Sequence, residues 1–459
     1  MRTLKDYSEN KSTSLSLLLR GLFSELETSE INFCIIGNYD SLPFYTENDV
    51  DIWVSDIRTA KRLLIETAKQ IGFVPLLWNL TSNGVNCFLT NDKSEVIHID
   101  LLKNVAWRSF IPIISKDALG KNISNFNGLK VASHEIAAFG HLLYPLLTFG
   151  EVKEKYKLRI HRFCATNEIF QDLIYEALGA SLAERILKMI CSEKWDDLVK
   201  VSRRVKFVIT VKFFIKKPVI FTCELVKFVY FNFRKIIYPS GVAVAFVGTD
   251  GSGKSTLLEK LTPTLAEIQI KENSRVRYWR PFILPKISAI FRQEKQKEKM
   301  NERSYISSVP KFNRIVSLIK FSYYFMDYFL GGIGSRLLVS RGGVILYDRH
   351  YDDLLVYPER FGMTLPTYIV KFCRLFLPQP DYVFYLKCSS TVLKERKKEI
   401  YDEELERQII EYTKLESKYK NYHSINSELT ADEVHNLVKG IVFKKIGRKA
   451  AISMNSHWL

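Results

Sequence analysis

A glycine-rich segment at residues 248–255, with the sequence GTDGSGKS, constrains the fold of this chain more than any other feature. The apolar run Val242–Val247 precedes it, and residues 255–261 have the pattern of a helix start. A strand, a glycine-rich turn and a helix in this order form a loop that cradles phosphate groups. Glycines let the chain curl so that successive backbone N–H groups point at an anion, with a helix N-terminus behind them. The segment therefore predicts a nucleoside-triphosphate site at the edge of an α/β sheet.

Individual residues of this loop have distinct expected roles. The ammonium of Lys254 would lie across the β- and γ-phosphates of ATP, and the Ser255 hydroxyl is a ligand for Mg²⁺. We predict these nucleotide-binding residues in the loop: Gly248, Asp250, Gly251, Ser252, Gly253, Lys254, Ser255 and Thr256. The alternative is a chance glycine-rich turn, and the flanking strand and helix argue against it.

A second element of the same site is the apolar run Val344–Tyr347, which ends in Asp348. A carboxylate at the end of such a strand supports Mg²⁺ in enzymes with this kind of loop. Arg349 follows at once, and its planar guanidinium suits two phosphate oxygens. The alternative is a surface Asp-Arg pair that closes a strand.

A third element is a charged helical stretch that contains Arg396 and, further on, Arg407. We predict that it closes over the triphosphate as a lid and shields the reaction from water. Arg396 is the candidate catalytic residue here, and Arg407 is a candidate nucleotide-binding residue. For Lys397 and Lys398 the alternative, a solvated helix face, is equally plausible.

The 459 residues are too many for one ordinary core and predict several domains. We expect an α/β domain at 1–125, a helical region at 126–199, a basic amphipathic connector at 200–240 and the phosphate-binding domain at 241–459. In the last part, Tyr382–Leu386 is another continuous apolar run of the kind found in buried parallel strands. Helical patterns separate these runs, which predicts a doubly wound parallel sheet.

Three acidic residues in the first part form a candidate metal site. Asp49 and Asp51 lie two positions apart on a predicted strand, so both carboxylates point to one face. Asp100 ends the run Val96–Ile99, and from a neighbouring strand it would complete an oxygen cage for Mg²⁺. The alternative is that all three are exposed strand and turn acids without a ligand.

The C-terminal part resembles the thymidylate kinase family. The resemblance rests on GTDGSGKST at 248–256, DRH at 348–350 and PQPDYV at 378–383, and it covers about residues 242–440. It implies a nucleoside-monophosphate-kinase fold that uses ATP and Mg²⁺. The catalytic residues that it implies are Lys254, Asp348, Arg349 and Arg396.

On the acceptor side, the resemblance assigns Asp250 to the acceptor sugar and Arg349 to the acceptor phosphate. Here the chain departs from housekeeping thymidylate kinases, with a charged insertion at Gln293–Arg303 and an altered stretch at Tyr351–Arg360. In these features it looks like the divergent thymidylate-kinase-like proteins encoded with bacterial capsule and polysaccharide genes. That likeness implies a nucleotide or sugar acceptor and a role in surface polysaccharide biosynthesis.

Residues from about 30 to 125 resemble the nucleotidyltransferase fold, in which a glycine turn precedes a DxD strand and a later strand supplies the last acid. The matching residues are Gly37, Asp49, Asp51 and Asp100. Asn38 stands where that family usually has a small Ser or Gly. The resemblance implies Mg²⁺ binding and a second, nucleotidyltransferase-like activity.

A net charge of +17 indicates an anionic partner. Between residues 200 and 237, ten basic residues face a single acid, Glu224. This segment fits peripheral contact with an anionic membrane, and it fits equally a buried helix pair whose lysines reach solvent. Nucleic acid is the least expected partner, because no stacking or groove-reading motif accompanies the charge.

The cellular setting follows from the cysteines and the N-terminus. Seven scattered cysteines without CxxC spacing argue against a disulfide framework and a structural zinc site. The first residues lack the apolar core of a signal peptide. We therefore expect a cytoplasmic protein, with membrane association through residues 200–237 as the open question.

Three function classes remain. The first is an ATP- and Mg²⁺-dependent kinase for a small-molecule acceptor. The second is a nucleic-acid-end kinase with nucleotidyltransferase activity, which the positive charge permits. The third is a nucleotide-binding regulatory protein at the membrane surface.

Overall fold

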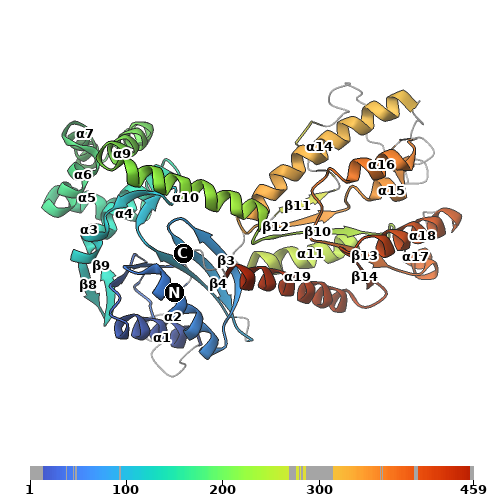
Figure 1. Cartoon of the computed structure of the whole chain (residues 1–459), viewed down its shortest axis with the longest axis horizontal. Coiled ribbons are helices and arrows are strands. Elements are labelled where there is room, and N and C mark those ends of the chain that lie inside the picture. The colour runs from blue at the N-terminus through green and yellow to red at the C-terminus, as the bar shows by residue number, and fades with distance from the viewer. Residues whose placement is uncertain are drawn as a thin grey trace. The chain divides into compact units, whose positions relative to one another are not determined.

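The computed structural model describes residues 14–37, 39–44, 46, 49–92, 95–267, 275–278, 280, 283–285, 314–361, 363, 365–396 and 402–454. Predictions that concern Asn38, the insertion Gln293–Arg303, Lys397 and Lys398 lie outside these residues. The chain divides into two compact units, Met1–Arg234 with Ala450–Leu459, and Lys235–Lys449. Figure 1 labels the elements of both units.

A mixed sheet forms the centre of the N-terminal unit, with the order β3-β4-β5-β2-β1-β9-β8 among the described residues. Its strands are β1 (Phe33–Ile35), β2 (Val50–Val54), β3 (Val74–Thr81), β4 (Gly84–Thr90), β5 (Val96–Leu102), β8 (Ile123–Phe126) and β9 (Leu129–Ala132). Strand β2 pairs antiparallel with β1 and parallel with β5. A separate hairpin pairs β6 (Val105–Trp107) with β7 (Ile111–Ile114).

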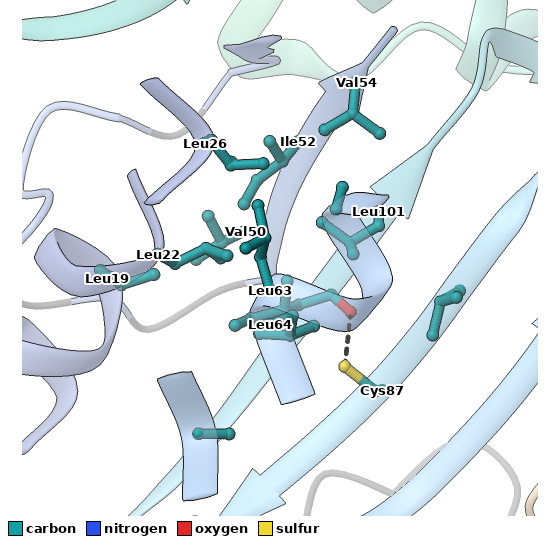
Figure 2. Close-up of a cluster of buried hydrophobic side chains, with 14 of the residues drawn as sticks. Leu19, Leu22, Leu26, Val50, Ile52, Val54, Leu63, Leu64, Cys87 and Leu101 are labelled. Atoms are coloured by element: carbon teal, nitrogen blue, oxygen red, sulfur yellow. Dashed lines mark hydrogen bonds between the residues drawn. The ribbon is translucent and has the colours of Figure 1, made fainter. Parts of the chain in front are cut away.

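Helices α1 (Ser14–Thr28) and α2 (Ile57–Ile71) bury their apolar residues against this sheet. The Asp56 side chain caps α2 by accepting hydrogen bonds from two backbone N–H groups, and Gly72 ends it with φ 88°. Figure 2 shows the resulting cluster, in which Leu22 of α1 lies near Val50 of the sheet and Leu26 lies near Ile52.

The remaining helices of the N-terminal unit pack around a second apolar cluster, which includes Cys34 and Trp53 from the sheet. They are α3 (Lys116–Lys121), α4 (His134–Thr148), α5 (Glu154–Thr166), α6 (Glu168–Leu178), α7 (Ala180–Cys191), α8 (Trp195–Lys200), α9 (Ser202–Lys216) and α10 (Pro218–Ile237). Helices α6 and α7 are separated at Gly179, whose φ of 79° suits glycine. Within the described residues, every helix is too short or too polar to cross a lipid bilayer.

The C-terminal unit contains a parallel sheet with the order β11-β12-β10-β13-β14 within its described part. Its strands are β10 (Val242–Val247), β11 (Arg275–Tyr278), β12 (Val344–Asp348), β13 (Tyr382–Lys387) and β14 (Tyr422–Asn426). Every neighbouring pair in this order is parallel. The first strand of the unit is therefore central, which confirms the predicted parallel α/β fold.

Helices cover both faces of this sheet, and Figure 1 shows α11 on one side and α14 on the other. The helices are α11 (Lys254–Glu267), α14 (Arg314–Ser340), α15 (Asp353–Val356), α16 (Thr367–Arg374), α17 (Ser390–Arg396), α18 (Asp402–Lys418) and α19 (Ala431–Met454), with a 3₁₀ turn η3 (Pro358–Phe361). The end of α19, from Ala450 onward, belongs to the N-terminal unit. Continuous apolar strands are typical of a sheet that is buried on both faces. Because helices cover both faces of the sheet, its polar side chains lie at the carboxyl edge.

Candidate active site

The glycine-rich loop leaves the carboxyl end of β10, between β12 and β13. Three of its glycines have positive φ angles, which are 145° at Gly248, 84° at Gly251 and 89° at Gly253. A Cβ atom at Gly248 would lie 3.0 Å from both the Leu386 carbonyl oxygen and Ser252 Oγ. The loop therefore needs glycine at this position for space as well as for conformation.

Lys254 begins α11 and folds back over the loop. Its Nζ donates hydrogen bonds to the carbonyl oxygens of Gly248 (3.0 Å) and Thr249 (2.7 Å) and to Ser252 Oγ (3.2 Å). Burial and the nearby Arg349 together lower the pKa of Lys254 from 10.5 to about 7, although neighbouring carboxylates act in the opposite direction. A buried ammonium with another cation beside it is stabilised by an anion, so the loop fits the phosphate groups of a nucleotide.

Asp348 stands where the sequence predicts it, at the end of β12 and directly beside Phe246 of β10 in the strand register. Burial raises the pKa of its carboxyl above the usual value, while Lys254 and Arg349 act in the opposite direction. A cation at this position would favour the ionised carboxylate. With the exposed Ser255 hydroxyl in the first turn of α11, this donor set fits Mg²⁺.

Asp250 in the loop is the centre of an ion-pair group. It accepts hydrogen bonds from Arg349 Nη2 and from Arg360 Nη1, the latter over 2.7 Å. Burial alone would raise the pKa of this carboxyl, but the two guanidinium groups outweigh it and hold the pKa at about 2. Asp250 is therefore a permanently ionised group that orients two arginines.

Arg349 is fixed from the other side as well. Its Nη1 donates to Asp353 Oδ2 over 2.8 Å, and Tyr412 donates to Asp353 Oδ1 over 3.0 Å. The backbone of Arg349 has a φ of 72°, and its N–H bonds to the Phe246 carbonyl over 3.0 Å. A non-glycine residue in this region costs about 1–3 kcal/mol and is held there by its surroundings. These contacts direct the guanidinium toward the loop.

Behind this group, a fully buried pair anchors the turn after β12. Arg374 Nε donates to Asp352 Oδ1 over 2.5 Å, and the Tyr422 hydroxyl donates to Asp352 Oδ2 over 2.5 Å. The guanidinium of Arg374 also lies 3.7 Å from the centre of the Tyr419 ring. The turn that carries Arg349 is thereby tied to α16 and β14.

A cavity of 270 Å³ adjoins the other side of the loop, and Gly253, Thr256, Arg396 and Ser427 are among its lining residues. Arg396 Nη1 donates to the Ser427 carbonyl over 3.0 Å, which places the guanidinium at the cavity wall. Apolar and small groups complete the wall. The cavity has room for a small group next to the glycine-rich loop.

The structure brings the predicted residues Lys254, Ser255, Asp348 and Arg349 to one edge of the sheet. It places Arg396 at the neighbouring cavity. Arg407 lies on α18, where it donates to Glu404 Oε1 over 2.7 Å and to the Val356 carbonyl over 2.9 Å.

Two site residues were missed in the sequence, Arg360 and Asp353. Both lie in the stretch that departs from thymidylate kinases. The run of charged residues in that stretch was the available signal, but nothing local linked Arg360 to the loop 110 residues earlier.

The N-terminal unit brings together the three predicted acids. Potential ligand atoms of Asp49, Asp51 and Asp100 lie within 4.8 Å of one another. The reason is the register of the parallel pair β2 and β5, in which Asp51 stands beside Asp100. Burial raises the pKa of Asp51 well above its usual value, and the neighbouring carboxylates Asp100 and Asp49 raise it further. This crowding of carboxylates fits a divalent cation.

Neighbouring side chains orient one of these acids. Asn86 Nδ2 donates to Asp100 Oδ1 over 2.6 Å, and His98 Nε2 lies 3.2 Å from the same oxygen. The His98 ring stacks on Phe88 with ring centres 4.1 Å apart.

Gly37, with a φ of 79°, lies where a Cβ would come within 3.1 Å of His141 Nε2. The glycine turn thus needs glycine at Gly37 for space.

A cavity of 330 Å³ in the same unit is lined by residues that include Arg108, Ser109, Tyr144 and Lys206. Burial raises the pKa of the Tyr144 hydroxyl, and the charges of the three acids raise it further, so the cavity lies near them. Two cations and a hydroxyl beside an acid group form a mixed-charge pocket. Sequence reasoning missed this pocket because its residues come from three separate segments.

Comparison with known proteins gives similarity only at the level of solved structures. No protein-family model matches the sequence, and no curated protein matches it. A thymidylate kinase from Candida albicans is similar with 15% identity and a TM-score of 0.33, over 45% of this chain and 93% of that enzyme. A thymidylate kinase from Ehrlichia chaffeensis has 16% identity and a TM-score of 0.33, over 44% of this chain and all (100%) of that one.

Proposed function

We propose that the C-terminal unit is an ATP- and Mg²⁺-dependent kinase that transfers a phosphoryl group to a phosphate of a small-molecule acceptor. The observation that carries this proposal is the glycine-rich loop at the carboxyl end of the central strand β10. Lys254 folds over this loop, and Asp348 lies at the end of the adjacent strand β12. Arg349 and Arg360 lie on one side of the loop and the cavity with Arg396 on the other.

In the proposed reaction, the bond between the γ-phosphorus and the β–γ bridging oxygen of ATP breaks, and a bond to an acceptor oxygen forms, releasing ADP. During the transfer, negative charge builds up on the oxygen that bridges the β- and γ-phosphates. The ammonium of Lys254 would neutralise this charge. Ser255 and Asp348 would hold Mg²⁺, which supplies further charge neutralisation at the phosphates. Arg349 would orient the acceptor phosphate.

The ionisation of Asp250 favours a phosphate over a hydroxyl acceptor. A hydroxyl has to lose a proton on transfer, and a carboxyl whose pKa is held at about 2 is a poor proton acceptor. An ionised phosphate oxygen needs no base. The two arginines around Asp250 would also bind such a dianion well. A nucleoside monophosphate or a sugar phosphate meets these requirements.

The test is a screen of nucleoside monophosphates, sugar phosphates and the matching unphosphorylated compounds for ATP consumption. We expect turnover with a phosphorylated acceptor, and none with Lys254→Ala. Lys420→Ala, a change of an exposed lysine after α18, is the matched control and should keep full activity. Full turnover by Lys254→Ala would refute the proposed site, and activity confined to unphosphorylated acceptors would refute the acceptor class.

A second activity is proposed for the N-terminal unit, on the observation that Asp49, Asp51 and Asp100 converge. We propose that this group holds a divalent cation in a nucleotidyltransferase-like site. Arg108 and Lys206 in the adjacent cavity would attract the phosphates of a nucleotide. The role in surface polysaccharide synthesis that the sequence suggests remains a prediction, and a sugar-phosphate acceptor found in the screen would support it.

A further inference from the structure

A cavity of 730 Å³ in the N-terminal unit has no role in either proposed activity. Residues of β7, α3, α4, α6, α9 and α10 line it, so the helix pair α9–α10 forms one wall. Cavities that bind small molecules have volumes of about 300–1,000 Å³. Neither the proposed kinase reaction nor the acid group on β2 and β5 uses this space.

The inner lining of this cavity is apolar. Phe110, Phe139 and Ile209 line it and are almost fully buried. Phe213 from α9 and Ile220 from α10 extend the apolar surface toward the opening. Aromatic and aliphatic side chains of this kind bind hydrocarbon, because the transfer of apolar surface out of water lowers the free energy.

The cavity is also strongly cationic. Among its lining residues, six lysines face three carboxylates, which belong to Asp117, Glu176 and Glu224. The lysines are Lys103, Lys116, Lys212, Lys216, Lys217 and Lys227. One of the three carboxylates, that of Glu224, is already bonded to Lys227 over 2.6 Å. The wall therefore has more cations than its own acids neutralise.

The positive charges lie close enough to affect one another. Burial lowers the pKa of Lys103; Glu224 raises it in part, and Lys227 and Lys116 lower it again. Burial and the charge of Lys216 likewise lower the pKa of Lys212. A bound anion would relieve this repulsion between cations.

We propose that this cavity binds an amphiphilic anion, with a hydrocarbon chain on the surface formed by Phe110, Phe139 and Ile209 and a phosphate head group at the lysine-rich wall, which includes Lys103 and Lys227. The apolar floor alone would accept any hydrocarbon, and the lysines alone would accept any anion. Their combination in one cavity selects a molecule that carries both groups. Such a molecule reaches the cavity either from free solution or from a membrane with which residues 200–237 make contact.

The first experiment measures binding of monododecyl phosphate to the full-length protein by titration calorimetry, below the critical micelle concentration. We expect saturable binding of one molecule. Inorganic phosphate and the uncharged dodecyl maltoside should each bind at least tenfold more weakly, because each lacks one of the two groups. Equal affinity for either of them, or no saturable binding of dodecyl phosphate, would overturn the proposal.

The second experiment uses the double variant Lys103→Gln with Lys227→Gln. Its affinity for dodecyl phosphate should fall at least tenfold, and that of Lys188→Gln, a change of an exposed lysine on α7, should not change. Circular dichroism shows whether the double variant is folded. If it is misfolded, Phe213→Ser replaces it with the same expectation. Unchanged affinity in a folded variant would contradict the proposed site.

A third experiment separates the two sources of the ligand. Vesicles that contain phosphatidylglycerol should bind the protein if the amphiphile comes from a membrane, and dodecyl phosphate should then compete with them. Binding of dodecyl phosphate without vesicle binding indicates a free amphiphile and equally supports the cavity. Vesicle binding that survives in the double variant, without any binding of dodecyl phosphate, would show a flat membrane contact and overturn the cavity proposal.

Discussion

Arg360 Nη1 donates a hydrogen bond to Asp250 Oδ2 over 2.7 Å, across 110 residues of sequence. Together with Arg349 on the other carboxylate oxygen, it makes Asp250 an ionised anchor for two guanidinium groups. The proposed acceptor side of the site therefore depends on a contact that no short motif contains.

Replacing this arginine should affect the acceptor more than ATP. In Arg360→Ala, Asp250 loses one charge-assisted hydrogen bond, worth about 1.5–3 kcal/mol, and Arg349 loses part of its orientation. We expect kcat/KM for the phosphorylated acceptor to fall about 10- to 100-fold while ATP affinity changes less than twofold. Steady-state kinetics test this, with the exposed Arg341→Ala as control. An equal loss of ATP affinity would contradict the assignment.

ATP binding should depend on pH through Lys254. Its pKa of about 7 in the free protein means that the amine is largely neutral at pH 8, whereas phosphate binding favours the ammonium. Binding above pH 7 therefore takes up a proton, and affinity should fall by up to about tenfold per pH unit. Calorimetry of Mg·ATP binding at pH 8, in buffers of different ionisation enthalpy, measures the uptake. Lys254→Arg, which stays charged, should show none. Proton uptake near zero in the unaltered protein would contradict the prediction.

The cavity on the other side of the loop should recognise the base. Stacking of a guanidinium on an aromatic ring contributes about 0.5–2 kcal/mol, so Arg396→Ala should raise the KM for ATP about tenfold. Affinity for inorganic tripolyphosphate, which has no base, should remain unchanged. Arg407→Ala, whose side chain is bonded to Glu404 and Val356, should have the smaller effect. A loss of tripolyphosphate affinity in Arg396→Ala would place this arginine on the phosphates instead.

Metal binding in the N-terminal unit should depend on Asp49, Asp51 and Asp100 and not on the C-terminal unit. Asp51→Asn with Asp100→Asn removes two of the three carboxylates, and equilibrium dialysis with Mn²⁺ should show one ion fewer bound per chain. Kinase turnover should be unaffected. The exposed Asp172→Asn on α6 is the control. An unchanged metal stoichiometry would show that the three acids converge without holding an ion.

The buried pair behind the active site should contribute to stability. Tyr422→Phe removes a hydrogen bond to the Asp352 carboxylate and should lower the free energy of unfolding by about 1–3 kcal/mol. Burial alone would raise the pKa of Asp352, but Arg374 and Tyr422 lower it below 3.8. The ionised Asp352 carboxylate therefore stabilises the folded protein above pH 3.8. This stabilisation is lost as the pH falls through the lower pKa that Asp352 has in the folded protein. Calorimetric unfolding at several pH values tests this, with the exposed Tyr368→Phe as control. A difference that grows in acid would contradict it.

Much of the geometry of the candidate phosphate site was predictable because it is local. The strand, the turn and the helix that hold Lys254 are adjacent in sequence, and glycine at positions 248, 251 and 253 is required by φ angles that other residues rarely adopt. Asp348 was predictable for a related reason. The ends of neighbouring parallel strands meet at one edge, so an acid after an apolar run is placed there by the strand itself.

The remaining features depend on contacts that only the folded chain makes. The sequence by itself determined the loop, the parallel strands and the candidate acids, because each follows from local conformation or the alternation of side chains along a strand. The tertiary structure decided that Arg360 meets Asp250, that β2 and β5 pair with Asp51 beside Asp100, and that lysines from four separate segments surround one apolar cavity. Strand register and helix packing bring these residues together, and neither can be predicted from the spacing of residues along the chain.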